Sequence, residues 1–170
     1  GDLQFLRATG MADALLRVWG QGRTRVVGIC GGFQMLGETL ADPHRLESST
    51  GEVFNGLGLL PVRTVLEREK HLSLTLARHC ASRAEVRGYE IHHGRTTAGR
   101  GIVPLMKTSK RETVAVGRKD ERCWGTYLHG VFDSDMFRRV FVDRLRLNRG
   151  VRPLGGIQAR YDIEPALDRL

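Results

Sequence analysis

Cys30 is the residue in this chain best placed to act as a nucleophile. It ends an apolar run and lies two residues from Gly28 and from Gly32, which is the spacing of a nucleophile elbow with cysteine in place of serine. In such an elbow a strand turns sharply into a helix, and small residues let the two pass close together, so that the nucleophile is strained and exposed. The first N–H groups of the helix favour a thiolate and an adjacent oxyanion. The pattern predicts catalysis, and a buried structural cysteine is the alternative.

His129 is the candidate base for this nucleophile. It ends an apolar stretch, residues 123–128, and precedes a predicted helix start, so it lies at a strand end where the active sites of α/β proteins form. A cysteine nucleophile needs a group that takes its proton and later returns one to the leaving amine. A histidine from a distant part of the chain is the usual solution. Alone, His129 would be structural; together with the elbow it indicates catalysis.

Apolar periodicity predicts the elements that position these two residues. Helices are expected over 3–9, 11–19 and 33–40, and another helix is expected to begin near Phe132, which packs on Phe137, with Asp133 as its cap. Strands are expected over 25–30, 61–66, 71–77, 113–116 and 123–128, and residues 85–97 read as a strand followed by a loop. Residues 47–51 form a polar loop, and no element is assigned between 97 and 111. This order predicts an α/β domain with an added antiparallel region.

Length and composition fit one globular domain. The chain has 170 residues, of which 41% are hydrophobic and 27% charged, with no apolar window of about 18 residues. Its three cysteines form no C-x-x-C pair, so neither a metal site nor a disulfide framework is predicted, and a reducing cytoplasm is the expected compartment. We expect no membrane partner. Because the first residue is Gly1 rather than methionine, we expect a processed chain or a fragment.

The positive charge of the chain raises the question of nucleic-acid binding. The net charge is +8 and the isoelectric point is near 10.1. The charge comes mostly from arginines spread from Arg7 to Arg169, without the interleaved aromatic residues that single-strand binding uses. We therefore expect a solvated arginine-rich surface and no nucleic-acid partner.

Several spaced motifs together resemble a known family. They are Gly28–Gly37 (GICGGFQMLG), Gly56–Pro61 (GLGLLP), Glu69-Lys70, Gly88–His92 (GYEIH) and Gly125–Gly130 (GTYLHG). In type and order they resemble the cobalamin-pathway branch of the class I, triad-type glutamine amidotransferases, and within it the cobyric acid synthase family. The resemblance covers about residues 2–145. It implies a flavodoxin-like, mostly parallel sheet with flanking helices and a small antiparallel region.

The resemblance implies a glutaminase and a set of site residues. Cys30 and His129 are the catalytic pair, and the Gly31 N–H is an oxyanion donor. Gln34 and Lys70 are candidate glutamine-binding residues, Lys70 being alternatively a surface charge. Class I members carry a glutamate two residues after the histidine, where this chain has Val131. We therefore expect a Cys–His dyad. Two pocket candidates remain: Glu90 orients the histidine or is a salt-bridged strand residue, and His92 faces the pocket or is a loop residue.

The family also implies partners outside this chain. Ammonia from L-glutamine reaches an amino-terminal synthetase domain, which uses ATP and Mg²⁺ to amidate corrin side-chain carboxylates. No phosphate-binding G-x-x-x-x-G-K-[ST] motif occurs here, so ATP and Mg²⁺ are expected on the synthetase and no cofactor on this domain. We expect residues 1–147 to form the amidotransferase domain, without its first strand and oxyanion loop, and 148–170 to form a loop and short helical tail. We therefore expect the chain alone to have low glutaminase activity.

Other functions stay open at this stage. The a,c-diamide synthase branch differs from this chain around the histidine motif. The glutaminase subunit of lipid II amidation shares the elbow but has a different version of the Gly88–His92 motif. A non-catalytic module that docks on a partner and binds an anionic ligand through its arginines is a candidate from another class. The intact pair of Cys30 and His129 favours the enzyme.

Overall fold

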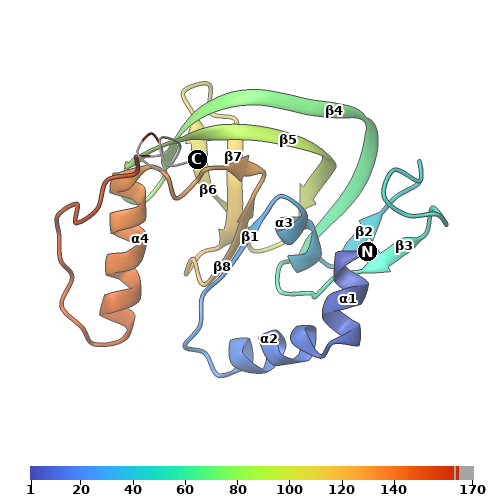
Figure 1. Ribbon diagram of the computed structural model, residues 1–170, viewed down its shortest axis with the longest axis horizontal. Helices are drawn as coiled ribbons and strands as arrows, with labels where there is room; N and C mark the ends of the chain where they lie inside the picture. Colours follow the sequence, from blue (N-terminus) through green and yellow to red (C-terminus); the bar gives the residue numbers. More distant parts are fainter. Residues whose placement is uncertain (163, 165–170) are drawn as a thin grey trace.

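The computed structural model describes residues 1–162 and 164, which fold as a mixed β-sheet flanked by helices (Figure 1). The helices are α1 (Asp2–Ala8), α2 (Met11–Gly20), α3 (Gly31–Leu36) and α4 (Asp135–Asn148). The strands are β1 (Val26–Ile29), β2 (Thr39–Ala41), β3 (Val53–Asn55), β4 (Val62–His79), β5 (Glu85–Ala98), β6 (Ile102–Thr108), β7 (Thr113–Arg118), β8 (Cys123–Thr126) and β9 (Leu128–His129).

The sheet combines parallel and antiparallel pairs. Its main order is β1-β8-β7-β6-β4-β2-β3, and β5 pairs with both β4 and β9. The pairs β1–β8 and β2–β4 are parallel, and the other pairings in the described residues are antiparallel. The α/β class with an added antiparallel region is confirmed, but this region is larger than the sequence predicted. The parallel pair β1–β8 carries the two candidate catalytic segments.

The hairpin β4–β5 is the longest feature of the sheet and curves across the molecule (Figure 1). The two strands predicted over 61–66 and 71–77 are one strand, β4, with a register irregularity between Leu66 and His71. The strand predicted from residue 85 continues to Ala98 instead of becoming a loop. Both differences have one cause, because β4 and β5 supply each other with backbone hydrogen bonds on either side of the irregularity.

Three other expectations differ from the structure. The helix predicted over 33–40 ends at Leu36, and Thr39–Ala41 forms β2 because it pairs in parallel with β4. The unassigned stretch contains β6. Asp133 does not cap α4, whose N-cap is Ser134; the Asp133 N–H donates instead to the Gly130 carbonyl.

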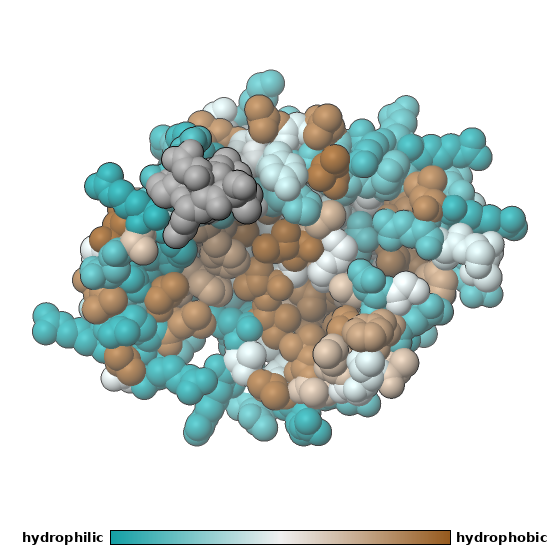
Figure 2. Space-filling view, viewed as in Figure 1, coloured by the Kyte–Doolittle hydropathy of each residue, from teal (hydrophilic) through white to brown (hydrophobic). Residues whose placement is uncertain are grey.

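Two apolar clusters form the core. One lies between α4 and the sheet around Trp124 and Phe137, and the predicted contact of Phe132 with Phe137 is confirmed by rings 5.8 Å apart. The other lies beneath α3 and includes Phe33 and Leu60. Further apolar side chains gather in the hollow between α4 and the helices α1 and α2 (Figure 2).

The helices and the tail of the chain bear on two further expectations. In the described part of the chain, every helix is too short or too polar to cross a membrane. The short helix predicted for the tail falls largely on residue 163 and residues 165–170, which lie outside the described residues.

Candidate active site

Cys30 has the backbone of a nucleophile elbow. It separates β1 from α3 with φ 52° and ψ −115°, a left-handed conformation that a residue with a Cβ rarely adopts. Close packing beneath it requires Gly28, because a Cβ there would lie 2.6 Å from the Phe33 Cα atom. Gly32 has no such constraint, since a Cβ there would meet no atom within 4 Å. The strand–helix contact thus depends on the first glycine of the motif alone.

The Cys30 thiol is partly buried and points toward β5. Its Sγ donates to the Ile91 carbonyl, with 3.8 Å between sulfur and oxygen. Burial raises the pKa of this thiol and the charge of Glu47 adds to the rise, while the Gly31 N–H acts in the opposite direction. The environment therefore favours the thiol over the thiolate. Formation of the nucleophile requires a base to take the proton.

His129 lies on the side of the sheet where the parallel strands β1 and β8 have their carboxyl ends. The parallel register pairs Ile29 with Thr126, and the Cys30 N–H donates to the Thr126 carbonyl at 2.9 Å, so both segments leave the sheet together. The His129 ring stacks on Tyr89 with 4.9 Å between centroids and 6° between planes. Its Nε2 is buried and has no hydrogen-bond partner among the described residues. That nitrogen remains available for proton transfer.

Glu90 does not orient His129. In the antiparallel pair β5–β9, Tyr89 is opposite His129 and Glu90 is opposite Leu128. Since side chains alternate along a strand, Glu90 points to the face away from His129. Its carboxylate accepts from the Thr75 hydroxyl at 2.8 Å and faces His92. These contacts favour the alternative interpretation of Glu90 as a paired strand residue.

Gln34 and Lys70 lie on different cavities. Gln34 is 4% exposed and lines a cavity of about 390 Å³ together with Gly31 and Glu47. Lys70 lines a second cavity, of about 1000 Å³, that His92 also lines. Gln34 thus lies beside the elbow, and Lys70 lines the larger cavity. Binding of glutamine by Lys70 stays a prediction.

A loop after β2 forms one wall of the smaller cavity. The buried Asp42 carboxylate accepts from the N–H groups of Leu46, Glu47 and Ser48 at 2.8–2.9 Å. Burial opposes the charge of Asp42, but these bonds hold its pKa at about 2. The loop is therefore fixed while Asp42 is ionised, and it presents Glu47 and Ser48 beside the elbow.

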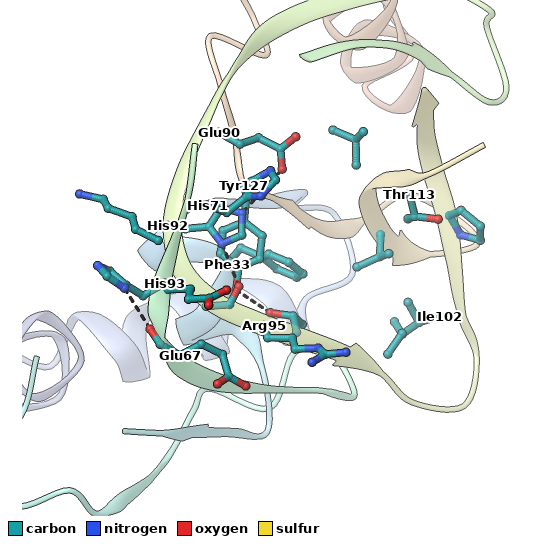
Figure 3. A pocket seen from close by; sticks show the side chains of 18 of the residues that line it. Phe33, Glu67, His71, Glu90, His92, His93, Arg95, Ile102, Thr113 and Tyr127 are labelled. Atoms are coloured by element: carbon teal, nitrogen blue, oxygen red, sulfur yellow. Dashed lines mark hydrogen bonds and ion pairs between the residues drawn. The ribbon is translucent and has the colours of Figure 1, made fainter. Parts of the chain in front are cut away.

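The larger cavity lies inside the curve of β4 and β5 (Figure 3). His92, a predicted pocket residue, lines it, stacked on Tyr127 with ring centroids 3.7 Å apart. His71 and Glu90 point into the same region (Figure 3). His71, Tyr89 and Tyr127 were not predicted from the sequence as site residues. The two tyrosines belong to the motifs that contain Glu90 and His129, and this was the only signal for them.

A strained cysteine elbow on an α/β fold, with a histidine at the adjacent strand end, fits the glutamine amidotransferase class. The fold agrees: a crystal structure described as glutamine amidotransferase superposes with a TM-score of 0.59 at 14% identity, covering 87% of this chain and 72% of that chain. The family model of the CobB/CobQ-like glutamine amidotransferase domain matches residues 1–137. The chain belongs to this family.

Curated relatives cover nearly the whole chain. A cobyric acid synthase of Nitratidesulfovibrio vulgaris is 42% identical over 204 residues, which span 100% of this chain and 38% of the relative. The cobyric acid synthase of Geobacillus thermodenitrificans is 42% identical across 99% of this chain and 34% of its own length. The bifunctional adenosylcobalamin biosynthesis protein CobDQ of Leptospira interrogans is 40% identical across 99% of this chain and 20% of its own. The chain thus spans well under half of these relatives.

Proposed function

We propose that the chain hydrolyses L-glutamine through a cysteine thioester. His129 takes the proton of the Cys30 thiol, and the sulfur attacks the side-chain amide carbon of glutamine. His129 then gives the proton to the departing nitrogen, so that ammonia leaves and a γ-glutamyl thioester remains. Water, deprotonated by the same imidazole, cleaves the thioester to glutamate and restores the thiol. The observation that carries this proposal is the strained left-handed backbone at Cys30.

The neighbouring groups have matching roles in this reaction. The Gly31 N–H lies beside the sulfur and would donate to the oxyanion that forms during attack. Gln34 lines the adjacent cavity and would contact the substrate. Glutamine would occupy this smaller cavity between α3 and the loop held by Asp42. We assign no role in this reaction to Lys70 or Glu90.

The ammonia would serve an ATP-dependent amidation of corrin side-chain carboxylates in cobalamin biosynthesis. Support comes from the relatives, which are cobyric acid synthases about 40% identical to this chain. Since the chain spans about a third of their length, the acceptor chemistry would belong to a synthetase portion outside the sequence matched here. ATP, Mg²⁺ and the corrinoid would bind to that portion. The remaining partner of this domain is then L-glutamine.

An exposed apolar face beside His129 would contact the synthetase. On the face of the β4–β5 hairpin that carries Tyr89, Leu72 is 72% exposed and Leu74 is 92% exposed. Large apolar side chains at such exposure, next to a catalytic residue, are typical of an interaction surface. Ammonia released at His129 would emerge at this face. The synthetase portion is the partner that would cover this face, because the proposed reaction needs an acceptor for the ammonia.

Selective alkylation tests the nucleophile. A glutamine-like diazoketone should label Cys30, and L-glutamine should protect it. Cys80 is exposed and serves as the control for simple accessibility, whereas burial raises the pKa of Cys123 to about 12. Peptide mass spectrometry would locate the label. Equal labelling of Cys30 and Cys80, or labelling that glutamine does not reduce, would contradict the proposal.

A further inference from the structure

Three side chains with metal-binding atoms meet on one face of the β4–β5 hairpin. The register pairs His71 with His92 and Ser73 with Glu90, so His71, Glu90 and His92 all point to the concave side (Figure 3). One ligand atom from each lies within 4.8 Å of the others. This face is opposite to the one that carries His129. The cluster therefore faces away from His129, while the His92 ring stacks on Tyr127, whose hydroxyl contacts Gln34.

The hydrogen bonds around His92 leave one nitrogen free to act as a ligand. Its Nδ1 is 2.8 Å from the Gly94 carbonyl, and because a carbonyl only accepts, Nδ1 carries the proton. In a neutral ring, Nε2 then presents a lone pair toward Glu90 Oε2, 3.7 Å away. This distance is too long for a hydrogen bond. A cation between these two atoms would satisfy both of them.

The surroundings resemble the outer shell of a metal site. A backbone carbonyl that accepts from the second nitrogen of a histidine ligand is a common arrangement, as at Gly94. The other oxygen of Glu90 is held by the Thr75 hydroxyl, which is 3.0 Å from the Ser73 hydroxyl. Ser73 in turn lies 3.1 Å from Nε2 of His71. Each of the three candidate ligands thus has a partner that restricts its orientation.

The donor set selects the kind of metal. Two imidazoles and one carboxylate suit Zn²⁺, whereas Mg²⁺ and Ca²⁺ prefer oxygen ligands alone. Ligand atoms around tetrahedral zinc lie about 3.4 Å apart, so the cluster needs only a small contraction from its present 4.8 Å limit. His71 is exposed to the cavity of about 1000 Å³, which leaves room for a fourth ligand.

We propose that His71, Glu90 and His92 bind one Zn²⁺ ion, with the fourth position open toward the larger cavity. The expectation that this chain has no metal site was based on cysteine spacing, and this cluster contains no cysteine. The remaining position would hold water or an anionic oxygen of a ligand in the cavity. The alternative is His92 facing Glu90 in the absence of any metal. The two differ in whether the chain binds one Zn²⁺ ion and in whether that binding depends on His71.

Metal titration of the whole 170-residue chain separates these possibilities. After treatment with a chelator, the protein would be titrated with Zn²⁺ by calorimetry, and the site would be read independently through the visible spectrum of bound Co²⁺. We expect one ion per chain, with a four-coordinate Co²⁺ spectrum that lacks a thiolate charge-transfer band. The last feature excludes binding by Cys30 or the exposed Cys80.

The matched variants are His71→Ala and His44→Ala. Both histidines are exposed and line the same cavity, but only His71 belongs to the cluster. We expect His71→Ala to weaken Zn²⁺ binding by at least about tenfold, as loss of a metal-site group does, and His44→Ala to have no effect. Circular dichroism would verify that both variants fold. Wild-type protein without stoichiometric binding, equal binding in His71→Ala, or equal losses in the two variants would overturn the proposal.

Discussion

At the scale of single residues, the proposed base His129 packs against an aromatic ring. Val131 is buried where class I relatives carry glutamate, and Glu90 lies on the other face of β5. Among the described residues, the Tyr89 ring stacks nearly parallel to the His129 ring. Tyr89 is thus a positioning residue in the proposed reaction.

Replacement of Tyr89 should lower turnover without blocking the chemistry. Aromatic stacking contributes about 0.5–1.5 kcal/mol, so Tyr89→Leu should reduce kcat by up to about tenfold and leave KM for glutamine nearly unchanged. Tyr89→Phe keeps the ring and should keep the rate. Steady-state glutaminase assays across pH would measure both, and the leucine variant should also shift the pH profile. Equal rates in the two variants would show that the stack has no such role.

The elbow offers a second test, on stability. Gly28→Ala would place a Cβ 2.6 Å from the Phe33 backbone, so we expect it to lower the free energy of unfolding by about 1–3 kcal/mol. Gly32→Ala places its Cβ in open space and should change this free energy by no more than about 1 kcal/mol. Urea unfolding of both variants measures the difference. Similar values would mean that the close strand–helix contact does not limit stability.

At the scale of elements, the positions of Cys30 and His129 at strand ends could be predicted from sequence, but the face to which β5 side chains point could not. Cys30 and His129 each lie in a local motif that indicates a strand end. The orientation of Glu90 depends on its pairing with Leu128, which no local pattern reveals. The strand β2 was mistaken for helix for the same reason, since its pairing with β4 overrides local periodicity. Local sequence patterns thus predicted where the strands end. The face to which a side chain points depends on pairing between strands that are distant in the sequence.

Glu121 joins three elements and should make their association depend on pH. It lies between β7 and β8, contacts His79 at the end of β4 at 3.5 Å, and pairs with Arg144 of α4. Burial opposes its charge, but the bonds to His79 and Arg144 lower the pKa of the carboxyl from 4.5 to about 2. A depressed carboxyl pKa stabilises the fold above pH 4.5, and this stabilisation is lost as pH falls toward 2.

Glu121→Gln should therefore be less stable than wild type at neutral pH, by about 1–3 kcal/mol, with the difference shrinking as the pH falls. Glu69→Gln, at an exposed position of β4, is the control and should follow the wild-type curve. Chemical unfolding at a series of pH values gives the three curves. If the difference in the free energy of unfolding between Glu121→Gln and wild type stays constant with pH, the proposed stabilisation by ionised Glu121 is contradicted.

At the scale of the whole molecule, the apolar outer face of β4 should matter only when a partner is present. Leu74→Asp should leave the stability of this chain unchanged, because the side chain is 92% exposed. It should weaken the complex with a synthetase portion by about tenfold or more, as expected for an apolar residue central to an interface. Val53→Asp, on β3 and 63% exposed, is the control. Binding and glutaminase stimulation would be measured together, and equal effects of the two variants would exclude this face.

The strand β5 directs its side chains alternately toward His129 and toward the larger cavity. Tyr89 stacks on the His129 imidazole and the main-chain carbonyl of Ile91 accepts from the Cys30 thiol, whereas Glu90 and His92 line the larger cavity. A complete substitution scan along this strand should therefore alternate in phenotype from one codon to the next, between loss of glutamine turnover and loss of cavity ligands. Insertion of a single residue would exchange the two sets, so a one-codon insertion here should be far more damaging than most substitutions.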